Sequence, residues 1–109
     1  MQGSKVLAYL GFARKAGKLR TGVNAISTLK SANVLVVCES ASENTVKDAL
    51  KLARRFHCPL VSSAISVEEI TGKENCKLLC VTDGNLAKAI LNNLDGNFTL
   101  KSEAVRTDG

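Results

Sequence analysis

The chain has 109 residues, of which 45% are hydrophobic and one is proline, and it carries a net charge of +5. This length and composition predict one domain with a core of Val, Leu, Ile and Ala, and they argue against a disordered chain. The four cysteines form no Cys-x-x-Cys pair and there is one histidine, which argues against a zinc site and fits a reducing, cytoplasmic compartment.

Basic residues are distributed unevenly along the chain. Residues 1–38 contain no acid, and the first carboxylate is Glu39. The basic residues of this segment are Lys5, Arg14, Lys15, Lys18, Arg20 and Lys30. A one-sided positive field attracts phosphates through steering and counterion release, so this segment predicts a surface that binds a polyanion.

The first part of the chain predicts a helix, a strand, a second helix and a buried strand. The first helix is indicated by apolar residues that recur with the helical period, namely Val6, Leu7, Leu10, Phe12 and Ala13. Its apolar run is too short to span a membrane, and Gly17 is placed to end it. Residues 18–21 predict a short strand, residues 22–30 a short helix, and the run "NVLVVC" a strand covered on both faces.

The second part of the chain continues this alternation. Ser40 and Glu43 have the spacing of a capping box, and they predict a helix that reaches Phe56. The elements that follow are a short strand at 59–62, a helical turn at 66–71 ended by Gly72, a strand at 76–82, and a helix from Asp83 that includes Leu94, with Gly96 just past its end. The alternation predicts a three-layer α/β/α sandwich, a single domain over residues 1–98, with helices on both faces of a mixed, largely parallel sheet of about four strands. Residues 99–109 are expected to be a polar, mobile tail.

Cysteine chemistry is the remote alternative for function. Cys38 ends a buried strand before a loop and a helix, which is where low-molecular-weight phosphatases place their nucleophile. This loop has no glycine or arginine to hold a phosphate, and Glu39 and Glu43 predict a raised thiol pKa. His57 and Cys58 are adjacent in sequence and would point to opposite sides of an extended segment. We therefore expect no catalysis, no metal and no cofactor.

The stretch "GKLRTGVNA" gives the main functional hypothesis. Gly22 opens a helix whose free N–H groups suit a phosphate or a base edge, and Asn24 carries a donor and an acceptor that can read a base. Lys18 and Arg20 lie just upstream, where they could contact a nucleic-acid backbone. Together with the acid-free field, these residues favour structured RNA as the ligand.

Three segments resemble one known family. These segments are "LGFARKAGKLRTG" at 10–22, "LVVCESASENTVK" at 35–47 and "VTDGNLAKAI" at 81–90. Their order and spacing resemble the kink-turn-binding ribosomal protein superfamily (the L-seven-Ae, L-thirty-e and Gadd type), most closely its short bacterial YlxQ-like branch. The resemblance implies an α/β/α sandwich that binds structured RNA, either ribosomal RNA or a kink-turn, without catalysis.

The resemblance also implies where RNA would bind. In the family, a Gly-x-Asn-Glu-x-x-Lys segment enters the RNA groove and two neighbouring loops close on it. Gly22 and Asn24 match this pattern, whereas Ala25 and Thr28 stand at the Glu and Lys positions. Glu68 stands at a position of the second loop where the family usually has glycine, and it would repel phosphate unless its side chain turns away. The residues expected to contact RNA are Lys18, Arg20, Thr21, Gly22, Val23, Asn24, Lys30, Ser42, Ser63 and Ala64.

A protein-interaction module of the same fold is the second hypothesis. It would use the basic residues of the helix that reaches Phe56, namely Lys47, Lys51, Arg54 and Arg55. An acidic protein partner would then bind this helix in place of RNA, whereas the leading hypothesis is a protein that associates with the ribosome or acts on another structured RNA.

Overall fold

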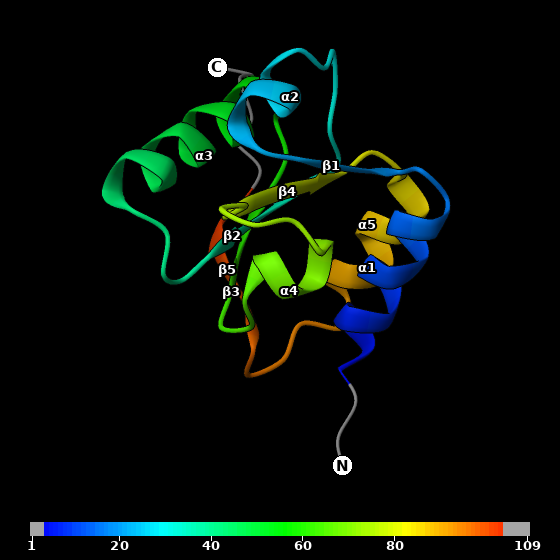
Figure 1. Ribbon diagram of the computed structural model, residues 1–109. Coiled ribbons are helices and arrows are strands. Elements are labelled where there is room, and N and C mark those ends of the chain that lie inside the picture. Colours follow the sequence, from blue (N-terminus) through cyan, green and yellow to red (C-terminus); the bar gives the residue numbers. More distant parts are fainter. Residues whose placement is uncertain (1–3, 104–109) are drawn as a thin grey trace.

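The computed structural model describes residues 4–103, which form five helices and a five-stranded mixed sheet (Figure 1). The helices are α1 (Lys5–Lys15), α2 (Val23–Ser27), α3 (Glu43–Phe56), α4 (Val67–Thr71) and α5 (Gly84–Leu91). The strands are β1 (Leu19–Thr21), β2 (Val34–Cys38), β3 (Leu60–Ser63), β4 (Leu78–Val81) and β5 (Phe98–Ser102). The predicted α/β class with a mixed sheet is confirmed, and the sheet has one strand more than expected.

The strand order in the sheet is β1-β4-β2-β3-β5. Only β2 and β3 run parallel, because α3 crosses between them and returns the chain to the same end of the sheet. The pairs β1–β4, β2–β4 and β3–β5 are antiparallel. The prediction of a largely parallel sheet is therefore wrong, since β4 inserts between β1 and β2 in the opposite direction.

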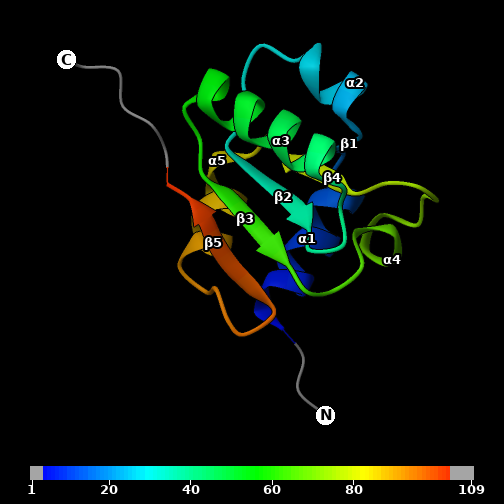
Figure 2. The same ribbon diagram turned by 90° about the vertical axis from the view of Figure 1, so that its left-hand side faces the viewer.

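Side chains of the sheet alternate between two hydrophobic clusters, which gives the three layers. Val34 and Val36 of β2 pack on the side of α1, α4 and α5, whereas Leu35 and Val37 pack on the side of α2 and α3. All five residues of β2 are buried, as expected for a strand covered on both faces. Figure 2 shows α2 and α3 above the sheet and α1 and α5 beyond it.

The C-terminal part of the fold corrects two predictions. Residues 99–102 belong to β5, which pairs with β3 along an outer edge of the sheet, so the predicted tail is wrong for these residues. Residues 104–109 of that tail lie outside the described residues. The last helix ends at Leu91, well before Gly96, because the Asp95 carboxylate accepts hydrogen bonds from Asn97 N (2.8 Å) and Phe98 N (3.2 Å) in a turn that leads into β5.

One predicted core residue lies at the surface. The side chain of Phe12 is 57% exposed and makes a tilted ring contact with Tyr9, at 6.5 Å between ring centroids. Val6, Leu10 and Ala13 are the residues of α1 that are buried. The buried stripe of α1 is therefore narrower than the sequence suggests, and Phe12 falls outside it.

Candidate nucleic-acid interface

Most of the predicted site residues lie at one end of the strands, where β1, β2 and β3 all terminate. Three backbone hydrogen bonds of 2.9 Å tie the segments at this end together: Gly22 N to Leu78 O, Cys38 N to Lys77 O, and Glu39 N to Ser63 O. The segment 21–24, the loop before α3 with Ser42, and the loop after β3 with Ala64 therefore lie at the same end of the strands, in the order of the strands in the sheet. These are the two flanking loops and the helix start that the sequence singled out.

Two of the predicted basic residues, Lys18 and Lys30, lie away from this end of the strands. The carbonyl oxygen of Lys18 accepts a hydrogen bond of 2.9 Å from Thr82 N, which places Lys18 at the opposite end of β1. Lys30 follows α2, whose last carbonyl groups are held by Arg55 near the end of α3. Because α3 has 14 residues and rises about 1.5 Å per residue, its end lies roughly 20 Å from its start at Ser42.

The predicted serines contribute in different ways. Ser42 is exposed and caps α3, since its Oγ accepts a hydrogen bond of 3.2 Å from Thr45 N. The expected capping box at Ser40 is therefore wrong. Ser63 is fully buried, and its hydroxyl donates to Ile65 O (2.6 Å) and accepts from Ile65 N (3.1 Å), so it shapes the loop and presents no group to solvent.

A group of exposed basic side chains lies around β1, at the outer edge of the sheet. Arg14 and Lys15 end α1 and are exposed, and Lys18 and Arg20 follow in the connection and in β1. Lys73, from the segment between α4 and β4, reaches β1 and donates a hydrogen bond of 3.2 Å to Thr21 Oγ1. Among residues 4–103 the only ion pair is Lys77–Glu68, so these five cations have no carboxylate partner in the described part of the chain.

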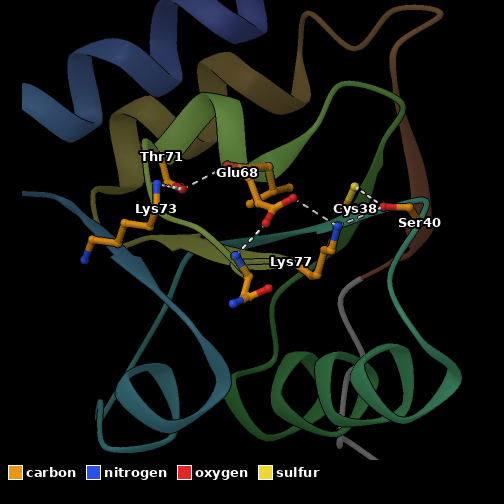
Figure 3. Close-up of polar contacts among 8 residues, drawn as sticks. Cys38, Ser40, Glu68, Thr71, Lys73 and Lys77 are labelled. Atoms are coloured by element: carbon orange, nitrogen blue, oxygen red, sulfur yellow. Dashed lines mark hydrogen bonds and ion pairs between the residues drawn. The ribbon is translucent and has the colours of Figure 1, made fainter.

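Glu68 is turned away from the basic surface (Figure 3). Its carboxylate accepts hydrogen bonds from the backbone N–H of Asn75 and from Lys77 Nζ, the latter at 3.2 Å. These two contacts lower the pKa of Glu68, the backbone N–H contributing more than the ammonium. The negative charge at this position is thus compensated within the protein.

Cys38 lies at the end of β2 in the same polar cluster. Its Sγ is 3.1 Å from Ser40 Oγ, which in turn accepts a hydrogen bond of 3.3 Å from Lys77 Nζ (Figure 3). Burial acts to raise the pKa of the Cys38 thiol, but hydrogen bonds from the Ser40 hydroxyl and from the backbone N–H groups of Val67 and Ser40, with the charge of Lys77, lower it overall. The expectation of a raised pKa is therefore wrong, because these hydrogen bonds and the charge of Lys77 outweigh the effect of burial on the pKa.

The helix of the second hypothesis has three free basic side chains. Lys47, Lys51 and Arg54 are exposed on α3. Arg55 is committed to the fold, since its guanidinium donates to Ser27 O (2.9 Å) and Leu29 O (3.2 Å) and lies 5.1 Å from the centre of the Phe56 ring. A partner of α3 would therefore meet three charges of the four.

Three members of the basic surface are not among the residues that the sequence predicts to contact RNA. Arg14 and Lys15 belong to the acid-free segment, but neither is in the stretch 17–25 that gives the main hypothesis. Lys73 is separated from Thr21 by 52 positions in the sequence, and only the β1–β4 pairing brings the two together. No local pattern around Lys73 indicates this contact.

The described residues offer no metal site, no disulfide and no membrane-spanning helix. Within residues 4–103, no group of three or more His, Cys, Asp or Glu side chains is arranged to hold a metal ion. All four cysteines are free and buried. In the described part of the chain, every helix is too short or too polar to cross a membrane.

Comparison with known proteins identifies the fold. Neither a family model nor a curated protein matches the chain. A solved structure, described as a protein with unknown function from Bacillus halodurans, superimposes with a TM-score of 0.70 at 21% sequence identity. The match covers 83% of this chain and 96% of the other. At this identity the likeness establishes a shared fold.

Proposed function

We propose that this chain is a non-enzymatic, cytoplasmic protein that binds structured RNA through the β1 edge of its sheet. The observation that carries the proposal is the group of five exposed cations around β1 that have no carboxylate partner among residues 4–103: Arg14, Lys15, Lys18, Arg20 and Lys73. Phosphate oxygens are the groups that such a surface attracts most strongly.

The neighbouring loops support RNA over an unstructured polyanion. Gly22 and Asn24 follow the end of β1, and the loops of Ser42 and Ala64 follow the ends of β2 and β3 on the same side of the sheet. RNA that is bent or locally unpaired exposes base edges that an amide side chain such as Asn24 can contact. In this account the cations on the β1 side hold the backbone, and the loops contact the bend.

The resemblance to the kink-turn-binding superfamily supports the same proposal. Ala25 and Thr28 replace the two charged residues of that family's motif, and both are at the surface of α2 or its end. Thr28 Oγ1 donates a hydrogen bond of 2.7 Å to Ala25 O, so it is occupied within the helix. Recognition of the bend would therefore depend on Asn24 and the loops.

Binding to a kink-turn RNA, and to the same duplex with its G·A pairs replaced, tests the proposal. Each RNA is titrated over a salt series. We expect both to bind at low salt and the kinked RNA to bind more tightly. Failure of both RNAs to bind at low salt would contradict RNA binding, and binding of an acidic protein in that case would select the α3 face as the functional surface.

A further inference from the structure

A pocket of about 270 Å³ opens along β1 within the basic surface. It is lined by two arginines, a lysine and four smaller residues: Arg14, Leu19, Arg20, Thr21, Ala25, Thr71 and Lys73. The lining comes from α1, β1, α2 and the end of α4. Sites for whole small-molecule ligands measure roughly 300–1,000 Å³, so this pocket fits a single compact group.

Each cation of the pocket is held by neutral oxygen atoms. Arg14 Nη1 donates to Ile70 O at 3.3 Å. Arg20 Nη1 donates to the carbonyl oxygens of Gly17 at 3.1 Å and Leu19 at 3.2 Å. Lys73 Nζ donates to the Thr21 hydroxyl at 3.2 Å. These bonds orient the side chains without neutralising their charge.

Gly72 allows the Arg14 guanidinium to occupy its place. A Cβ at position 72 would lie 2.9 Å from Arg14 Nη2, which is closer than real contacts allow. Gly72 also has a φ of +72°, at the end of α4. An alanine here would displace the guanidinium and leave the net charge unchanged.

Carboxylates surround the α4–β4 segment on another side but do not line this pocket. Glu68, Glu69 and Glu74 line a neighbouring depression, which Gly72 and Lys73 also line. Figure 3 shows the Lys73 side chain directed away from Glu68, whereas Lys77 reaches toward it. Three cations that converge without a counter-ion repel one another, and an anion between them would relieve that repulsion.

We propose that this pocket binds one phosphate group. Arg14 and Arg20 would donate from their guanidinium groups, Lys73 would supply a point charge, and the Thr21 hydroxyl would add a neutral donor. The phosphate is either a backbone phosphate of RNA, in which case the inference rests on the proposed function, or a free phosphate ester.

Titration with inorganic phosphate at constant ionic strength, followed by the backbone amide signals in NMR, tests the site directly. We expect saturable shifts at Thr21, Gly72 and Lys73. Lys73→Ala should weaken the phosphate affinity roughly tenfold, as loss of a charged hydrogen bond predicts. Lys101→Ala removes the same charge from β5, at the opposite edge of the sheet, and should change the affinity less than about twofold.

A pair of glycine variants separates pocket geometry from charge and from backbone strain. Gly17 has the same φ of +72° as Gly72, but a Cβ there would meet nothing within 4 Å. Gly72→Ala should therefore weaken phosphate binding, and Gly17→Ala should not. Equal effects of the two variants, or shifts that spread over the surface without saturation, would overturn the proposal.

Competition then identifies the source of the phosphate. If inorganic phosphate lowers the affinity of the kink-turn RNA for the parent protein but not for Lys73→Ala, a backbone phosphate occupies the pocket. RNA that binds without competition assigns the pocket to a free phosphate ester. Saturable phosphate binding by a protein that binds neither RNA supports the pocket while contradicting the proposed function.

Discussion

Arg55 shows how one basic side chain can belong to the fold and not to a binding surface. It holds two carbonyl groups after α2 and lies over the Phe56 ring, whereas its neighbour Arg54 is exposed. The sequence does not distinguish the two arginines, since both belong to the group of basic residues on the predicted helix. Only the contact with α2, 26 to 28 positions away, distinguishes them.

Replacement of Arg55 should therefore destabilise the protein. Arg55→Ala loses two hydrogen bonds and the ring contact, and we expect the free energy of unfolding to fall by about 1 kcal/mol. Urea denaturation provides the measurement. Arg54→Ala is the matched control, with an expected change within about 0.5 kcal/mol. Equal losses in the two variants would contradict the role assigned to Arg55.

Two buried thiols make stability depend on alkaline pH. Burial raises the pKa of Cys58 to about 12, with a smaller effect from the nearby Cys80, and burial raises the pKa of Cys80 to about 11. In the unfolded chain both thiols ionise near pH 9. The folded protein therefore binds more protons than the unfolded chain above pH 9, so its stability falls as the pH rises.

The expected slope is about 1.4 kcal/mol per pH unit for each thiol. Unfolding by urea between pH 9 and 10.5 measures it. In Cys58→Ala only Cys80 contributes to this slope. The part of the pH dependence that comes from the thiols should therefore be about half as steep as in the parent protein. A pH dependence unchanged by that substitution would show that Cys58 ionises equally in both states.

At the level of single elements, the N-terminus of α3 is stabilised by one of two nearby serines. Ser42 accepts the hydrogen bond from Thr45 N, whereas Ser40 contacts Cys38 and Lys77. Loss of an N-cap costs about 1 kcal/mol, so Ser42→Ala should lower the free energy of unfolding by that amount. Ser40→Ala serves as the control, and a larger loss there would instead favour the capping box that the sequence suggested.

The sequence predicts the elements better than their arrangement. Most helices and strands appear where periodicity and caps indicate them, and Asp83 caps α5 through hydrogen bonds from Asn85 N and Leu86 N. β5 escapes prediction because its apolar alternation consists of only Phe98 and Leu100, and Leu100 is 45% exposed. The direction of β4 is set by long-range pairing with β1 and β2, for which a single sequence carries no signal.

The candidate site is likewise predicted only where its residues are close together in the sequence. Segment 21–24 is found from a local motif, the loops of Ser42 and Ala64 are implied by the family resemblance, and the parallel β2–β3 pair places both loops at the same end of the strands. Lys73 joins the site only through the position of β4 beside β1. Conversely, Lys30 is close to the motif in sequence and distant from it in the fold.

At the scale of the whole molecule, the acid-free start of the sequence becomes one side of the protein. α1, β1 and α2 follow one another along the chain, and β1 is an edge of the sheet with a helix on each face (Figure 1). The opposite edge is β5, which carries the exposed Lys101. Four of the six basic residues of the acid-free segment, Arg14, Lys15, Lys18 and Arg20, therefore lie at or beside the β1 edge.

The most direct test of this account is the salt dependence of RNA affinity in two single-charge variants. Arg20→Ala removes a cation from the β1 edge, and Lys101→Ala removes one from the β5 edge. We expect Arg20→Ala to weaken binding to both the kink-turn RNA and its control duplex and to flatten the plot of log affinity against log salt by about one. Lys101→Ala should match the parent protein. Equal slopes for Arg20→Ala and the parent would contradict the placement of RNA on the β1 edge.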